Sequence, residues 1–174
     1  MNETIKNLKE RRSIRSFSSK ELRKDILEEI IEAASYAPSG MGAQSAKMVV
    51  VTNKEIIKKL STLNAKVMGT VDKDPFYGAP TVVVVFADSS RKTFVEDGSL
   101  VMGNLMNAAH ALDVDSCWIH RAREVFESEA GKELMALWGI DENYVGIGHC
   151  VLGYREGDYP TAKPRKEDYA IYIS

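Results

Sequence analysis

Residues 81–87 read Thr81-Val82-Val83-Val84-Val85-Phe86-Ala87, and this run is the clearest strand in the chain. β-Branched side chains favour the pleated backbone, and the preceding Gly78-Ala79-Pro80 closes a predicted loop over residues 72–80. A second predicted strand, residues 144–154, is apolar along most of its length. We therefore expect this strand to be covered on both faces of a sheet.

Helices are predicted on both sides of the residue 81–87 strand. Apolar residues recur at helical spacing from Leu22 to Ala34, and Ser18 with Glu21 resembles a capping box ahead of them. Asn53 is suited to cap a second helix. The remaining predicted elements are strands over 48–52 and 114–120, a buried helix over 94–112 and a helix over 124–138. Without repeats or a linker, residues 1–174 are expected to form a single domain.

The bulk composition argues against several classes of protein. The formal net charge is −2, so no overall basic field favours nucleic acid or an anionic membrane. The longest apolar stretch, residues 82–87, is far shorter than the ~20 residues of a membrane span. Residues 1–12 are polar and lack the apolar core of a signal peptide, so we expect a cytoplasmic protein.

Several common catalytic motifs are absent from the sequence. Gly146 and Gly148 form a G-x-G, but Val151 occupies the third glycine position of a dinucleotide fingerprint. There is no P-loop and no G-x-S-x-G elbow. The two cysteines and three histidines have no metal-ligand spacing; the histidines are His110, His120 and His149. We expect Cys117 and Cys150 to be buried, reduced thiols.

Arg11, Arg12, Ser13 and Arg15 concentrate positive charge in a chain that is nearly neutral. Arg11 and Arg15 project to the same side in a helix, and in a strand they share a face with Ser13. Like charges at this spacing repel each other unless an anion lies between them. Because a guanidinium donates two parallel hydrogen bonds, the cluster suits a phosphate.

A second basic set, Lys163, Arg165 and Lys166, follows Pro160 in an irregular C-terminal segment. The two sets could close on one phosphate. Each set also has a purely structural explanation. Arg11 and Arg12 would offset the dipole of a helix over residues 2–10, and the C-terminal set would be part of a solvated tail.

Taken together, the motifs resemble the nitroreductase family of FMN-dependent oxidoreductases along nearly the whole chain. No single motif is diagnostic, but their order and spacing are. The stretches that carry the resemblance are Arg11–Phe17, Ala37–Gln44, Gly78–Pro80, Asp97-Gly98, Asn104-Leu105, Ser116–Ile119, Gly148, Gly153-Tyr154 and Lys163–Arg165.

The resemblance implies an α+β fold: a three-layer sandwich with a central mixed, mostly antiparallel sheet flanked by helices. It also implies an obligate homodimer with two flavin sites at the interface, and a C-terminal tail docking on the partner subunit. The apolar end of the tail, Ile171-Tyr172-Ile173, is consistent with docking.

The resemblance further implies the residues that bind FMN. Arg11 and Ser13, with Lys163 and Arg165, would hold the phosphate, and Arg12 would assist through its backbone. Arg15 would reach the pyrimidine edge of the flavin. The ring would be lined by two further groups: Pro38, Ser39, Gly40 and Gln44 from the neighbouring subunit, and Trp118, Ile119, His120 and Arg121, with the His120 backbone N–H facing flavin N5.

Two positions depart from the family pattern. Gly42 stands where asparagine is common, and Ser45-Ala46 stand where Pro-Trp is common. These changes affect the loop expected to line the flavin of the neighbouring subunit.

The implied activity is hydride transfer from NAD(P)H to flavin N5, followed by transfer to a nitroaromatic, a quinone or a similar electron-poor acceptor in a ping-pong order. No side-chain acid or base is required, so no catalytic residue and no metal are expected. Two alternatives stay open: an FMN-binding or storage protein without physiological turnover, and a phosphate- or phosphosugar-binding protein without flavin.

Overall fold

The computed structural model describes residues 1–173, and strand β2 (Thr81–Asp88) lies at the centre of its sheet. The sheet has the order β1-β2-β4-β3, and each neighbouring pair is antiparallel. The four-stranded sheet is therefore antiparallel rather than mixed, and a parallel bridge between Ser13 and Ser116 is isolated from its strand pairings. The other three strands are β1 (Ala46–Val51), β3 (Asp115–Ile119) and β4 (Tyr144–Gly153).

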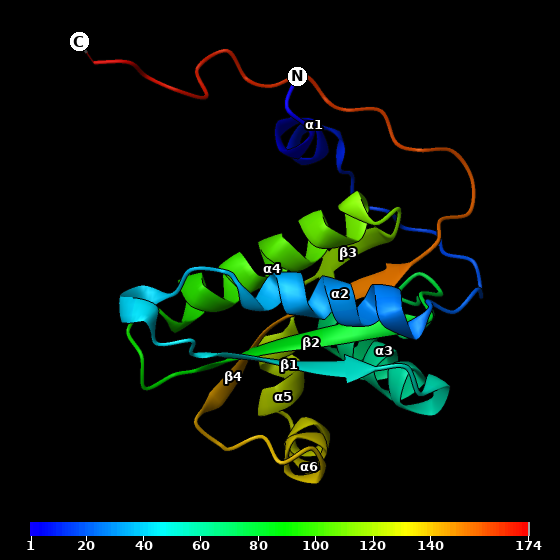
Figure 1. Ribbon diagram of the computed structural model, residues 1–174. Coiled ribbons are helices and arrows are strands. Elements are labelled where there is room, and N and C mark those ends of the chain that lie inside the picture. The colour runs from blue at the N-terminus through cyan, green and yellow to red at the C-terminus, as the bar shows by residue number, and fades with distance from the viewer. Residues whose placement is uncertain (174) are drawn as a thin grey trace.

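Helices cover both faces of the sheet, which confirms the predicted three-layer α+β architecture (Figure 1). Helices α2 (Lys24–Ser35) and α4 (Phe94–Ala111) pack on one face. The opposite face carries α3 (Lys54–Met68), α5 (Ala122–Glu127) and α6 (Glu129–Leu137). Two further elements complete the fold: α1 (Glu3–Glu10) and the 3-10 turn η1 (Gly40–Gly42).

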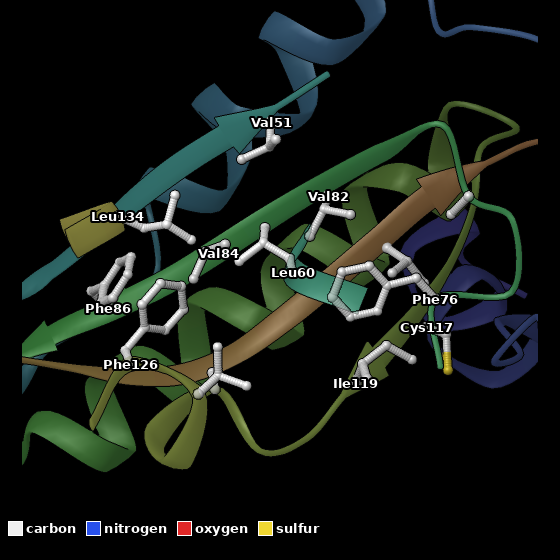
Figure 2. Close-up of a cluster of buried hydrophobic side chains, with 14 of the residues drawn as sticks. Val51, Leu60, Phe76, Val82, Val84, Phe86, Cys117, Ile119, Phe126 and Leu134 are labelled. Carbon is white, nitrogen blue, oxygen red and sulfur yellow. The ribbon is translucent and has the colours of Figure 1, made fainter. Parts of the chain in front are cut away.

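Strand β2 supplies both hydrophobic cores because its side chains alternate between the two faces. Val82, Val84 and Phe86 point into the core beneath α3, α5 and α6, where Figure 2 shows Phe86 facing Phe126. Their ring centroids are 4.7 Å apart. The intervening residues, Val83, Val85 and Ala87, enter the core beneath α2 and α4. Residues 81–87 of β2 are all buried.

Helix α4 approaches β4 closely at Gly98. A Cβ atom at this position would lie 2.5 Å from Ile147 Cγ1, closer than side-chain contacts allow. The absence of a side chain at Gly98 therefore lets this helix, predicted to be buried, pack tightly against β4.

Two local predictions are wrong. The helix expected over residues 124–138 is interrupted at Ser128, whose ψ of 156° is extended and whose Oγ caps α6 by accepting the Gly131 N–H at 3.1 Å. The capping box at Ser18 and Glu21 does not form, because α2 begins only at Lys24. The Ser18 N–H instead donates to the Tyr154 carbonyl at 2.8 Å, tying this segment to the end of β4.

The N-terminal helix and the C-terminal segment lie on the same side of the molecule (Figure 1). Every residue from 160 to 173 is exposed in the single chain, including the apolar Ile171 and Tyr172. Docking of this segment on a partner subunit stays a prediction. Within the described residues, none of the helices combines the length and the apolar character needed to cross a membrane.

Candidate functional site

Residues of both basic sets found in the sequence line one cavity of about 960 Å³, although Lys166 of the second set does not. The walls of this cavity come from the end of α1 and from the C-terminal segment, where Arg165 Nη2 donates to the Lys163 carbonyl at 2.9 Å. All five predicted phosphate-side residues line it, and so does Arg15, which was predicted to reach the pyrimidine edge; the five are Arg11, Arg12, Ser13, Lys163 and Arg165.

Arg11 and Arg12 each have a buried donor without a hydrogen-bond partner among residues 1–173, Nη1 in Arg11 and Nε in Arg12. Arg11 follows the last residue of α1, and its backbone N–H donates to the Asn7 carbonyl at 3.0 Å. An unpaired buried donor costs about 1–3 kcal/mol, and more when charged. The C-terminal end of α1 favours the positive charge of Arg11, and an anion in the cavity would favour it further.

Arg12 lies in the same cavity but is mostly engaged within the protein. Its Nη1 donates to the carbonyls of Lys9 at 2.7 Å and Arg11 at 2.8 Å, which satisfies the C-terminal end of α1. Its backbone N–H, expected to assist with the phosphate, donates to Tyr159 Oη at 2.9 Å. Arg12 is therefore best placed to fix α1 and the C-terminal segment around the cavity.

An extended segment beside β3 explains how Ser13 and Arg15 face the cavity together. The Ile14 N–H donates to the Ser116 carbonyl at 3.0 Å, and the Ile14 side chain is buried. Because side chains alternate along extended backbone, Ser13 and Arg15 point away from the core. The sequence left open whether the arginine cluster is helical or extended, and the structure shows that it is extended around Ile14.

A second cavity, of about 450 Å³, lies at the C-terminal end of β3. Arg15 lines both cavities, so it marks where the basic cavity meets the second one. Lys73 adds a further cation to the wall. The four predicted ring-side residues are all present there: Trp118, Ile119, His120 and Arg121.

The remaining predicted ring-side residues, which are Pro38, Ser39, Gly40 and Gln44, line neither cavity of the same chain. Their loop contacts the start of α4 through Gly40 and Asp97, whereas α1 contacts α4 near its end, where Asn7 Nδ2 donates to the Asn107 carbonyl at 2.9 Å. The loop and the basic cavity therefore lie toward opposite ends of α4, as expected if the loop serves the neighbouring subunit.

Asp97 holds this loop in place, a role that sequence reasoning did not find. Its buried carboxylate accepts hydrogen bonds from the Gly40 N–H at 2.9 Å and Ser45 Oγ at 2.6 Å, and Thr93 Oγ1 lies at 3.3 Å. The Ser45 hydroxyl, aided by the other donors, lowers the pKa of Asp97 despite its burial. Ser45, a departure from the family pattern, thus supplies a contact of its own.

Gly40 cannot carry a side chain in this arrangement. A Cβ atom there would lie 2.3 Å from Thr93 Oγ1. The Pro38–Gly40 motif therefore reflects close approach of the loop to the segment that precedes α4.

Cys117 borders the second cavity without providing a nucleophile. The residue is only 2% exposed, and burial raises the pKa of its thiol even though Arg15 and Arg11 favour the thiolate. At neutral pH it stays a thiol, in agreement with the sequence prediction.

The fold and these cavities define an α+β protein with a basic cavity beside a smaller one at the end of β3. Residues 8–70 and 67–154 match the model of the Nitroreductase family, so the chain belongs to the nitroreductase family.

Three relatives illustrate the similarity. A provisionally named NADH dehydrogenase/NAD(P)H nitroreductase of Archaeoglobus fulgidus is 33% identical over 173 residues, covering 95% of this chain and 94% of the relative. An FMN reductase (NAD(P)H) of Bacillus subtilis is 38% identical over 98 residues, or 56% of this chain and 37% of the relative. The crystal structure of a nitroreductase with bound FMN from Bacteroides fragilis has a TM-score of 0.91 and 26% identity, and the match covers 100% of both chains.

Proposed function

We propose that this protein is an FMN-dependent oxidoreductase that takes electrons from NAD(P)H and acts as a homodimer with a flavin at each subunit interface. The observation that carries the proposal is the convergence of Arg11 and Ser13 with Lys163 and Arg165 of the distant tail on one cavity. Guanidinium and ammonium groups gathered in this way suit a phosphate, and the FMN-bound relative shares the fold over its full length.

In this proposal the basic cavity binds the FMN phosphate. Arg11, Ser13, Lys163 and Arg165 contact the phosphate, while Arg12 fixes the end of α1. Arg15, which borders both cavities, lies at the pyrimidine edge of the flavin.

The second cavity receives one side of the ring. Trp118, Ile119, His120 and Arg121 form its wall within one chain. The Asp97-anchored loop, with Pro38, Ser39, Gly40 and Gln44, comes from the partner subunit. A monomer would therefore lack part of the ring site, which makes dimer formation a condition for activity.

FMN held by these residues would supply the redox chemistry, carrying electrons from NAD(P)H to a nitroaromatic, a quinone or a similar electron-poor acceptor in a ping-pong order. The chain binds the phosphate, orients the ring and places a cation where negative charge develops. Arg15 supplies that cation. With Cys117 protonated, no side chain at this cavity needs to act as a nucleophile.

The test is to purify the protein and record its visible spectrum. We expect a yellow protein with about one FMN per chain that oxidises NADH or NADPH when a nitro compound or quinone is present. A colourless protein that takes up no added FMN would refute the flavin assignment. Tight FMN binding without acceptor-dependent NAD(P)H oxidation would instead favour the storage alternative.

A further inference from the structure

Asn64 is a completely buried polar residue of helix α3 whose amide is used at both ends. Its Nδ2 donates to the His120 carbonyl at 2.7 Å, and its Oδ1 accepts a hydrogen bond from Arg121 Nη1 at 3.3 Å. One side chain therefore bonds both the backbone and the side chain of the segment that follows β3.

The segment that Asn64 contacts has an unfavourable backbone conformation. Arg121 has φ 74° and ψ 15°, the left-handed region that residues other than glycine seldom occupy. Such a conformation persists only where surrounding contacts hold it, and it is often found at functional sites. The two hydrogen bonds of Asn64 are contacts of this kind.

The segment that Asn64 contacts, His120-Arg121, lines the second cavity, but Asn64 itself does not. Asn64 lies behind this segment. Neighbouring residues of α3 hold the helix independently of Asn64. Leu60 belongs to the core beneath α3, α5 and α6, and Ala65 is also buried. The bonds from Asn64 therefore determine the geometry of the cavity wall more than the stability of α3.

We infer that Asn64 is a positioning residue: its amide fixes the His120 backbone and the Arg121 guanidinium at the wall where the flavin ring is expected. This inference rests on the proposed function. The asparagine amide provides the donor and the acceptor that this arrangement uses on two separate atoms of one short side chain. Aspartate would keep the acceptor for Arg121 but lose the donor to the His120 carbonyl, and leucine would lose both at similar volume.

The first experiment compares Asn64→Leu and Asn64→Asp with Ala65→Gly, a control that weakens α3 at a neighbouring buried position. We expect Asn64→Leu to bind FMN within about threefold of wild type, because the phosphate cavity is untouched, and to be reduced by NADH at least about tenfold more slowly. Its bound-flavin absorbance and visible circular dichroism should change. Asn64→Asp should be intermediate, and Ala65→Gly should keep the wild-type spectrum.

The second experiment needs no cofactor. Amide hydrogen exchange of the peptide containing residues 119–122 should be at least about tenfold faster in Asn64→Leu than in wild type or Ala65→Gly, measured on the full chain. If wild type reduces FMN normally and Asn64→Leu matches it in exchange, spectrum and rate, the inference is overturned while the proposed function stands. If wild type binds no FMN, the proposed function fails, and unchanged exchange in Asn64→Leu would still overturn the inference separately.

Discussion

Tyr159 and Arg12 join the C-terminal segment to the end of α1. Tyr159 Oη accepts the Arg12 N–H at 2.9 Å and donates to the Glu10 carbonyl at 3.0 Å. The Tyr159 ring also lies 5.0 Å from the Arg155 guanidinium and stacks on His110 with centroids 6.1 Å apart. This anchor keeps the following basic residues of the tail beside the arginine cavity.

The first prediction concerns this anchor. Tyr159→Phe removes the hydroxyl and leaves the Arg12 N–H and the Glu10 carbonyl without their partner, which should cost about 1 kcal/mol of unfolding free energy. Because Lys163 and Arg165 are then held less firmly, we expect FMN to bind about three- to tenfold more weakly in a fluorescence titration. Tyr169→Phe, a change at an exposed tyrosine, is the matched control, and an equal loss in both variants would contradict the anchoring role.

The second prediction separates the two arginines that face the cavities. Arg11→Ala removes a charged phosphate donor and should weaken FMN binding by about 1.5–3 kcal/mol, roughly ten- to 150-fold. Arg15→Ala removes a cation near the ring, so the reduced flavin should be less stable and its reduction potential should fall, by about 30 mV for each 1.4 kcal/mol lost. Affinity comes from titration and potential from dye equilibration. Equal effects of the two variants on both quantities would show that these roles are wrong.

The fold was largely predictable because its central elements carry strong local signals. Strand β2 begins with five β-branched residues and is buried from residue 81 to 87. Asn53 caps α3 as predicted by accepting the Ile56 N–H at 3.0 Å. The break at Ser128 was missed because the apolar spacing continues across it, and only the extended Ser128 backbone separates the two helices. Ser18 does not cap α2 but bonds to the distant Tyr154, a pairing that no local pattern reveals.

The candidate site was predictable only where its residues cluster in the sequence. The arginines and the basic tail stand out because they concentrate charge in short segments. Asn64, Asp97 and Tyr159 are single polar residues in helices or loops, and each acts through a partner distant in the chain. Asp97-Gly98 belonged to the family pattern, but its function becomes visible only once the loop from Gly40 to Ser45 is folded against α4.

The third prediction tests the support of that loop. Asp97→Asn replaces a buried carboxylate that accepts from Gly40 and Ser45, so we expect a loss of about 2 kcal/mol in urea unfolding at neutral pH and weaker FMN binding by the dimer. The pKa of Asp97 is lowered in the folded state, so its contribution is present above the unfolded pKa and is lost as pH falls through the folded one.

Ser45→Ala is the milder companion variant, since it removes one donor and leaves the charge. It should cost about 1 kcal/mol. The difference in stability between wild type and Asp97→Asn should shrink in acid, below the unfolded pKa of an aspartate. A difference that stays constant down to that range would show that the carboxylate is not ionised in the folded protein.

The last prediction concerns His149, a fully buried residue of β4 whose ring lies 5.2 Å from that of Phe76 and 5.9 Å from that of Phe126. Neither ring nitrogen has a hydrogen-bond partner among residues 1–173. Burial lowers the pKa of His149 to about 4, and the backbone of Ile119 and His120 offsets this only in part. The imidazole is therefore neutral in the folded protein at neutral pH.

Because the unfolded chain binds a proton at His149 near pH 6.5 and the folded chain only near pH 4, stability should fall as pH decreases through this interval. From about pH 7.5 to 5 the loss attributable to His149 is about 2 kcal/mol. His149→Leu, which fills a similar volume without a titrating group, should lose that much less over the same range in urea unfolding. Phe76→Leu alters the packing around the same ring, so it should lower stability at every pH without flattening the slope. If the slope of His149→Leu equals that of wild type, His149 is protonated to the same extent in both states, and its burial does not govern the acid sensitivity of the fold.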